Sequence, residues 1–433
     1  MGSTAVVPLI LLIVVLGSSV WVGLGLLGVG VISLELFRSM PVDKLLAQAV
    51  WNGLSSPELL ALPLFILMAE LLMRSKFIDG VFGSLEPWLR NTPGGLLHTN
   101  IVGCALFALV SGSSAATTSS IGRITIGELK ERGYDENVTI GTLAGAGTLG
   151  FLIPPSIVMI IYGVLSQTSV LKLFAAGLLP GLLLTLCFSG YVGILSYFRP
   201  SIVGPRVETS KADLWRARRE HLPQLLPFLI LILAILGSIY GGLASPTEAA
   251  AFAVIMTGII MMFEGTMSVQ MLRDACIGTA RIVSMLGLII AAASFLSVTM
   301  GFLGMPQAIL NFINGLDLAP LALIALLIVI YIVLGSFLEG MSIIVMTIPI
   351  VLPLVVAAGY DSLWFGVFLI LMVELAQISP PVGMNLFVLQ GLTKKPLSEI
   401  TRAAFPFFLI MLAFVLLLAV FPSIVAFIPN LIS

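Results

Sequence analysis

Two proline-centred stretches interrupt long apolar segments of this chain and decide its fold. The first is Gly147-Thr148-Leu149-Gly150-Phe151-Leu152-Ile153-Pro154-Pro155-Ser156, and the second is Gln377-Ile378-Ser379-Pro380-Pro381-Val382-Gly383-Met384-Asn385. A proline inside a helix has no N–H to donate, and its ring displaces the carbonyl four residues earlier. The prolines therefore predict a broken helix at each stretch, with free carbonyls at Gly150, Phe151, Ala376 and Gln377.

The composition places these breaks inside a lipid bilayer. Of 433 residues, 59% are apolar and 9% charged, and the 20 Lys and Arg nearly balance the 21 Asp and Glu. Soluble proteins carry about 25% charged residues, so this composition excludes a soluble enzyme, a nucleic-acid-binding protein and a disordered scaffold. The apolar runs are continuous, without the alternation of a barrel strand. We therefore predict an all-α polytopic membrane protein.

Short motifs recur in the same order in the two halves of the chain. The matching pairs are Gly133-Tyr134-Asp135 with Gly359-Tyr360-Asp361, Pro154-Pro155 with Pro380-Pro381, and Ser111-Gly112-Ser113 with Leu334-Gly335-Ser336. The first two pairs share an offset of 226 positions, and the third has an offset of 223. One motif alone would be weak, but several in order at nearly one offset predict two structural repeats.

The positive residues of the loops predict which side of the membrane each loop faces. Short loops rich in Lys and Arg are cytoplasmic. This rule assigns the linker 199–224 and the loops 74–93, 128–137 and 393–402 to the cytoplasm. Segment 94–131 lies between two of these loops and is too short for two full spans, so we expect a re-entrant hairpin there.

The corresponding hairpin of the second repeat, 318–358, is flanked by Asp317 and Asp361 and no Lys or Arg, so we expect it to enter from the periplasm. Two repeats of opposite topology are typical of transporters. The predicted organisation is a first inverted repeat 1–198 with hairpin 94–131 and broken helix 137–166, a basic linker 199–224, and a second repeat 225–433 with hairpin 318–358 and broken helix 362–392.

A polar turn precedes the helix break in each repeat. The turn Val110–Ser120 has seven hydroxyl side chains in eleven residues, and Leu334–Ser342 is its counterpart. Hydroxyl and carbonyl oxygens suit a hard cation such as Na⁺, whereas the N–H groups at half-helix N-termini suit carboxylates. Small residues could instead serve close helix packing, but that would leave the freed carbonyls unexplained. We predict two pseudo-symmetric cation sites with an organic anion between them.

The candidate site residues belong to these turns and breaks. The residues assigned to Na⁺ are Ser111, Gly112, Ser113, Gly150, Pro154, Ser156, Gly335, Glu339, Gly340, Ser379, Pro380 and Gly383. The residues assigned to the substrate are Ser114, Thr117, Pro155 and Asn385. We expect no catalytic residue, no cofactor, and no metal other than Na⁺ as coupling ion.

Ionisable residues within apolar segments are candidates for function. Glu339 lies in the second turn and is a candidate for a direct or indirect role in cation binding, and Glu374, before the second break, either pairs or faces water. Segments 40–56 and 267–281 are predicted to be short amphipathic helices in the membrane interface. Segment 5–36 is predicted to form two short helices broken around Gly17-Ser18-Ser19.

The sequence resembles the large membrane subunit of tripartite ATP-independent periplasmic (TRAP) transporters over essentially its whole length. The resemblance is carried by Leu62-Pro63-Leu64-Phe65-Ile66-Leu67, Val110-Ser111-Gly112-Ser113, Gly133-Tyr134, Ile153-Pro154-Pro155-Ser156-Ile157, Ser245-Pro246-Thr247-Glu248-Ala249-Ala250, Gly335-x-Phe337-x-Glu339, Ile348-Pro349-Ile350-x-x-Pro353 and Pro380-Pro381-Val382-Gly383.

The resemblance implies Na⁺-coupled uptake of organic acid anions, typically C4-dicarboxylates or sialic acid, across the bacterial inner membrane. It also implies a periplasmic substrate-binding protein, a small four-helix membrane subunit, and an elevator mechanism in which hairpins and broken helices move against a scaffold. Many family members have an acidic residue six positions after the first serine of Ser-Gly-Ser. This chain has Thr117 there, which leaves open the cation number and the substrate contacts at that position.

Three other functions fit the sequence less well. A one-component divalent-anion/sodium symporter has a similar design but works without partners. An intramembrane serine protease using Ser111 or Ser113 needs a base within reach, and His98 and His221 are the only histidines. A channel is disfavoured because paired hairpins with helix breaks favour alternating access. The chain also has no P-loop motif for ATP.

Cysteine labelling tests the predicted topology. After replacement of the three native cysteines by alanine, Asp213→Cys should react with a membrane-impermeant maleimide only from the cytoplasm, and Asp317→Cys only from the periplasm. Labelling from the opposite sides would contradict the inverted repeats.

Overall fold

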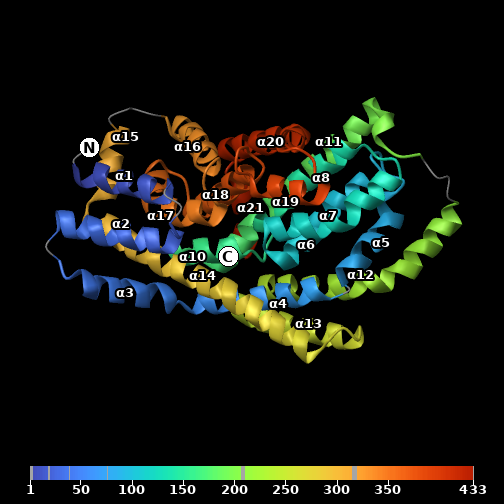
Figure 1. The fold of residues 1–433 in the computed structure, drawn as a ribbon, viewed down its shortest axis with the longest axis horizontal. Coiled ribbons are helices and arrows are strands. Elements are labelled where there is room, and N and C mark those ends of the chain that lie inside the picture. Colours follow the sequence, from blue (N-terminus) through green and yellow to red (C-terminus); the bar gives the residue numbers. More distant parts are fainter. Residues whose placement is uncertain are drawn as a thin grey trace.

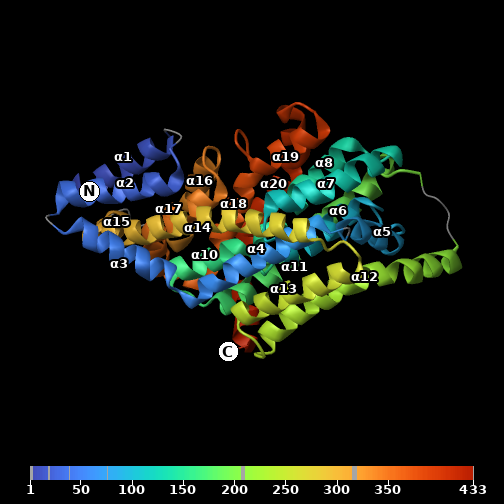
Figure 2. The same cartoon turned by 60° about the horizontal axis from the view of Figure 1, so that its bottom comes forward.

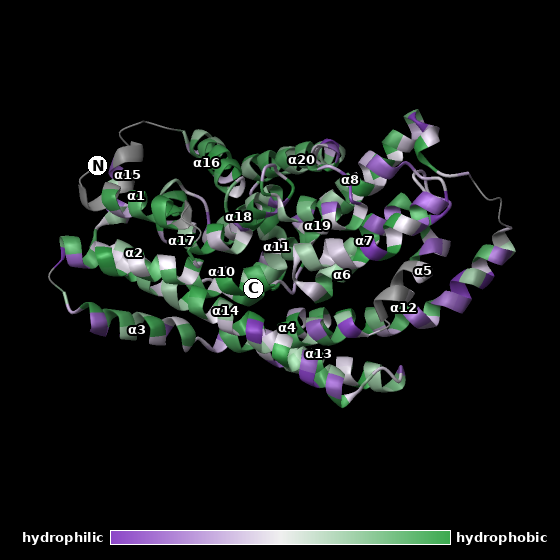
Figure 3. Ribbon diagram, in the orientation of Figure 1, coloured by the Kyte–Doolittle hydropathy of each residue, from purple (hydrophilic) through white to green (hydrophobic). Residues whose placement is uncertain are grey.

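The computed structural model describes residues 3–17, 20–38, 40–75, 77–205, 210–314 and 319–432. Within these ranges the chain forms helices and no strands, which confirms the all-α prediction. Six helices are long and apolar enough to cross a membrane, or up to eight if each of two bent helix pairs is one span. Apolar residues run along most of the helices, as Figure 3 shows.

Long helices from both halves of the chain form one side of the molecule. They are α2 (Val22–Phe37), α3 (Val42–Leu54), η1 (Pro57–Leu60), α4 (Ala61–Arg74), α5 (Phe77–Leu89), α12 (Lys211–Tyr240), α13 (Pro246–Phe263) and α14 (Val269–Phe302). In Figure 1 the blue helices α3 and α4 lie alongside the yellow helices α13 and α14, and α14 packs on α2, α3 and α4. We call this group the outer layer.

The other side contains the helices with the turns and breaks. From the first half these are α6 (Leu97–Ser111), α7 (Ser114–Glu131), α8 (Glu136–Gly147), α9 (Leu149–Leu152), α10 (Ile157–Ser166), α11 (Val170–Phe198) and η2 (Pro200–Ile202). From the second half they are α16 (Pro320–Gly335), α17 (Gly340–Ala357), α18 (Ser362–Gln377), α19 (Met384–Thr393), α20 (Leu397–Val420) and α21 (Ser423–Ile432). We call this group the inner group.

Within the inner group, helices of the second half pack against helices of the first half. Both views, in Figures 1 and 2, show this arrangement. Helix α20 packs on α8, α19 packs on α7, and α11 packs on α21 and α18. At the edge of this contact Lys395 Nζ lies 3.1 Å from Glu136 Oε2. This ion pair joins the start of α8 to the short connection between α19 and α20.

Helices occupy the segments that were predicted to form the two hairpins and the two broken helices, whereas the repeat organisation itself stays a prediction. The first hairpin corresponds to α6 and α7, and the second to α16 and α17. Segment 5–36 forms α1 (Ser3–Gly17) and α2, as predicted. Ser18, Ser19 and Asp317 lie outside the described residues, and the orientation of each hairpin relative to the membrane stays a prediction.

One of the two predictions of a short interface helix is wrong. Segment 267–281 is not a short helix, because α14 continues without a break from Val269 to Phe302. Its charged first turns resemble an interfacial segment, but no proline interrupts the helix after them. The other, 40–56, corresponds to α3, which bends by 58° into Pro57–Arg74. The remaining short helix, α15 (Met305–Asn314), comes after α14.

Candidate ion and substrate site

The first polar turn is closed by its own hydroxyl groups. Helix α6 ends at Gly112, whose φ of +54° favours glycine. Ser113 caps α7 and accepts a hydrogen bond from the backbone N–H of Ala116 at 3.4 Å. Ser111 Oγ and Thr117 Oγ1 lie 2.8 Å apart, and Thr117 Oγ1 donates to the carbonyl of Ser113 at 2.8 Å. The hydroxyl of Thr117 therefore stabilises the turn.

The first helix break packs directly against this turn. Helices α8 and α9 meet α10 at an angle of 42°, and the intervening residues through Ser156 are buried. A methyl group on Gly150 would lie 2.6 Å from the carbonyl carbon of Ser113, and one on Gly112 would lie 3.4 Å from the carbonyl oxygen of Pro155. Glycine at position 150 thus permits a close approach between the backbones of turn and break.

Ser156 ends the break and caps the next helix. Its Oγ accepts the backbone N–H of Met159 at 3.5 Å, at the start of α10. Pro154 is buried beside it, in a cis peptide bond with Pro155. The structure therefore brings the first group of predicted residues, from Ser111 to Ser156, into one contiguous buried region.

The second turn is built differently. Glu339 caps α17, because its Oε2 accepts the backbone N–H groups of Met341 (3.0 Å) and Ser342 (3.3 Å). Gly335 packs against Ala376, and a methyl group on Gly340 would lie 2.9 Å from Gln377 Nε2. The turn therefore rests on the last residues of α18.

The second break satisfies a carbonyl that the prolines were expected to free. The carbonyl of Ala376 accepts hydrogen bonds from the backbone N–H of Ser379 at 3.2 Å and from its hydroxyl at 3.1 Å. The prediction of a free carbonyl at Ala376 is therefore wrong, because the neighbouring serine replaces the lost helical donor. Gly383 lies close to the carbonyl oxygen of Ser379. Pro380 is exposed.

Glu374 connects the two halves at the first turn. It is fully buried in α18. Its carboxyl oxygens lie 2.6 and 2.7 Å from Ser114 Oγ, and Oε1 accepts the backbone N–H of Phe151 at 2.6 Å. The expectation that Glu374 pairs or faces water is thus resolved in favour of pairing. Its partners lie more than 220 residues away in sequence, which is why spacing alone could not identify them.

A second buried polar group lies near the start of α19. Asn385 has 0% exposure, and neither polar atom of its side chain has a hydrogen-bond partner within the described residues. Thr118 Oγ1 is likewise buried and unpartnered there. Both side chains approach Gly147 at the end of α8. Thr118 was not a predicted site residue, although it belongs to the hydroxyl-rich turn.

The four residues assigned to substrate therefore lie in two places. Ser114, Thr117 and Pro155 belong to the first turn and break, with the hydroxyl of Ser114 directed at Glu374. Asn385 lies with Thr118 and Gly147. The two regions are joined through α7, which carries Ser114 and Thr118 one turn apart.

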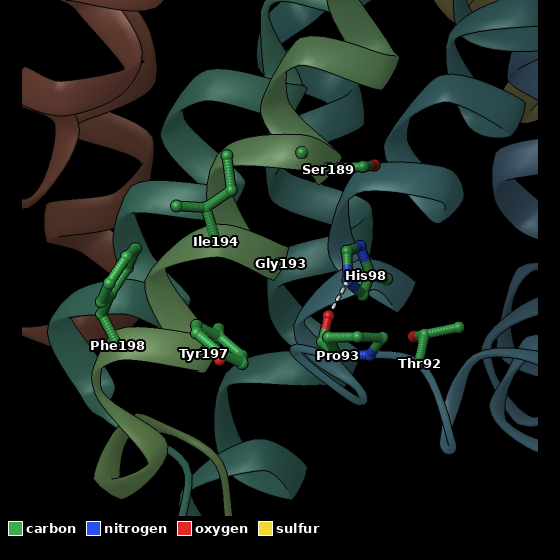
Figure 4. Close-up of a pocket in the computed structure, with 9 residues that line it drawn as sticks. Thr92, Pro93, His98, Ser189, Gly193, Ile194, Tyr197 and Phe198 are labelled. Atoms are coloured by element: carbon green, nitrogen blue, oxygen red, sulfur yellow. Dashed lines mark hydrogen bonds between the residues drawn. The ribbon is translucent and has the colours of Figure 1, made fainter.

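Two adjoining cavities near the start of α6 lie away from the turns and breaks. Figure 4 shows the smaller one, of about 490 Å³, between the start of α6 and the end of α11, where His98 Nε2 lies 2.6 Å from the carbonyl oxygen of Pro93. A more polar cavity of about 1420 Å³ adjoins it at Thr92 and Tyr197. Neither includes a residue predicted to bind the ion or the substrate.

The fold is that of a polytopic helical membrane protein. The crystal structure of the YdaH transporter from Alcanivorax borkumensis superposes with a TM-score of 0.68, covering 96% of this chain and 98% of that chain at 14% identity. This likeness supports the fold class.

Sequence relatives identify the family. Residues 7–424 match the model described as tripartite ATP-independent periplasmic transporter, DctM component. The large permease DctM for C4-dicarboxylates from Pseudomonas aeruginosa is 33% identical over 86% of both chains. The ectoine/5-hydroxyectoine permease UehC of Ruegeria pomeroyi is 30% identical over 92% of both chains, and the sialic acid permease SiaM of Vibrio cholerae is 28% identical over 95% of both.

The chain belongs to the DctM family of TRAP transporter large permeases. It is a transport protein of the bacterial inner membrane and not an enzyme.

Substitution of Gly150 tests the close contact between turn and break. Gly150→Ala should destabilise the protein by about 1–3 kcal/mol, the usual cost of overpacking, because the added methyl group meets the backbone of Ser113 and Ser114. Gly127→Ala in α7 is the matched control, because its methyl group would have open space. The melting temperature of the purified protein is measured; equal values for both variants would contradict the contact.

Proposed function

We propose that this chain is the Na⁺-coupled permease of a tripartite uptake system, working with a small membrane subunit of four helices and a periplasmic binding protein. The observation that carries the proposal is the contact of the first hydroxyl-rich turn with the first helix break. It gathers hydroxyl and backbone oxygens of Ser111, Ser113 and Thr117 beside Gly150 in a buried region. Such oxygens replace the hydration shell of a hard cation.

The proposed mechanism is of the elevator type. The inner group, which carries both turns and both breaks, is the proposed transport domain, and the outer layer is the proposed scaffold. Support comes from the packing, since α14 contacts α2, α3 and α4 extensively, while α19 and α20 of the second half pack on α7 and α8. A group held together in this way can move as one body.

The proposed substrate is an organic acid anion. The relatives carry names for C4-dicarboxylates, sialic acid and ectoine, and a carboxylate is common to these molecules. Asn385 remains the proposed substrate contact of α19, because its amide is buried without a partner within the described residues. A side-chain amide can complement a polar substrate with either of its groups, because its NH₂ group has two donors and its oxygen is an acceptor.

Omission of each component tests the tripartite assignment. Proteoliposomes with this chain, the small subunit, the binding protein and a Na⁺ gradient are expected to accumulate labelled substrate, and removal of any one of the four should abolish uptake. Transport by this chain alone would instead support a one-component symporter.

Ser113→Ala tests the first cation site. Loss of the hydroxyl should raise the Na⁺ concentration for half-maximal uptake about tenfold, equivalent to about 1.4 kcal/mol of binding. Ser120→Ala, six residues further along α7 than Ser114 and also half-buried, is the control and should leave this concentration unchanged. An unchanged Na⁺ dependence in Ser113→Ala would remove Ser113 from the site.

A further inference from the structure

Glu374 is a carboxyl group in an environment that does not favour a free charge. It is fully buried, and an uncompensated buried charge is costly even when it is hydrogen-bonded. The hydroxyl of Ser114 and the N–H of Phe151 satisfy its oxygens but supply no positive charge. Its negative charge therefore needs either a proton or a cation.

The surrounding helices offer no permanent cation for this role. The ionisable residues on the elements that pack against α18 are Tyr162, Lys172, Cys187, Tyr191, Tyr197, Tyr331, Glu339, Lys394, Glu399 and Arg402. Tyr162 donates to the carbonyl of Ser362 and Tyr331 to Thr347. Among the described residues, none forms an ion pair with Glu374.

The cations of these elements are Lys172, Lys394 and Arg402, and all three are exposed. Lys172 is in the first turn of α11, and Lys394 comes directly after the last residue of α19. On α7 the first cation after Ser114 is Arg123, nine residues on, which corresponds to about 14 Å along the helix axis. Arg123 is exposed, so it does not reach into the buried region.

The partners of Glu374 belong to both parts of the first turn-and-break region. Ser114 comes directly after the turn, and Phe151 is next to Gly150, whose added methyl group would meet the backbone of Ser113. A cation held by the oxygens of this turn would thus lie next to the carboxyl group of Glu374.

We propose that Glu374 supplies the negative charge of the first cation site, and that a proton neutralises it when the cation is absent. This inference rests on the proposed Na⁺ coupling and adds to it an exchange of ions. When the cation enters, the carboxylic O–H bond breaks, the proton leaves to water, and the cation balances the remaining carboxylate. The net charge of the buried region is then the same before and after binding.

The hydrogen bonds identify the oxygen that carries the proton. Oε1 accepts the N–H of Phe151 in either state. Ser114 Oγ lies 2.6 Å from Oε1 and 2.7 Å from Oε2, and a hydroxyl can accept from a protonated acid or donate to a carboxylate. Only Oε2 is free of the N–H of Phe151. The proton is therefore assigned to Oε2, and Ser114 serves both states by rotating its O–H.

Proton release on Na⁺ binding tests this exchange without a transport assay. The chain and its small membrane subunit are placed in nanodiscs in weak buffer with a pH-sensitive dye, and NaCl or KCl is added. We expect about one proton released per chain on NaCl addition and none with KCl. In Na⁺ titrations followed by thermal stabilisation, the affinity should fall up to about tenfold per pH unit on acidification.

Glu374→Gln should abolish proton release, weaken Na⁺ binding at least tenfold at alkaline pH, and make the remaining affinity independent of pH. Glu70→Gln is the matched control, because it removes a carboxylate that is paired with Arg74 in the outer layer; it should release protons as the unchanged protein does. Na⁺ binding without proton release, unaltered in Glu374→Gln, would overturn the exchange but leave Na⁺ coupling intact. Absence of Na⁺ binding in the unchanged protein would overturn both.

A second variant decides between the outcomes if Glu374→Gln does not fold. Ser114→Ala keeps the carboxyl group and removes its hydroxyl partner, and alanine favours the helix. A hydrogen bond to the charged carboxylate is stronger than one to the neutral acid. Loss of the hydroxyl should therefore move the pH dependence of Na⁺ affinity toward higher pH. An unmoved pH dependence in Ser114→Ala would contradict the assignment.

Discussion

The structure depends on one constraint: a backbone polar group cannot remain unsatisfied in a bilayer. The chain interrupts its helices at two proline pairs, and residues of both halves cover the first interruption. Residues 147–156 are all buried, with the turn of α6 and α7 on one side and Glu374 of α18 on the other. Packing of the two halves against each other thus covers the backbone of the first break.

The two breaks share a proline pair but not an environment. The first is enclosed, whereas Pro380, Pro381, Val382 and Met384 of the second are exposed. Equivalent sequences in unequal surroundings fit the proposed mechanism of alternating access, in which only one side of a carrier is open at a time. In the proposed mechanism, the exposed second break is therefore the side of the site that faces an aqueous path in this conformation.

The features that sequence could predict are those governed by local chemistry. Prolines located the breaks, and glycine with a left-handed φ ended α6 at Gly112. The local rule failed at Ala376, because Ser379 provides two donors for its carbonyl. It failed again for α14, where charged first turns resembled a surface helix but no residue stops the helix before Phe302. Glu374 and its partners meet only through tertiary packing, which no spacing rule describes.

The threonine at position 117 and the burial of Glu374 bear on the same charge balance. Within the first turn every polar side chain is a hydroxyl, so the turn itself is neutral. A cation bound there alone would be a buried, uncompensated charge, which is costly. In the proposed exchange, α18 meets this requirement rather than α7, since Glu374 contacts the turn through Ser114. Because this carboxyl group comes from the second half, occupation of the site in the first half would alter a contact that joins the two halves within the inner group.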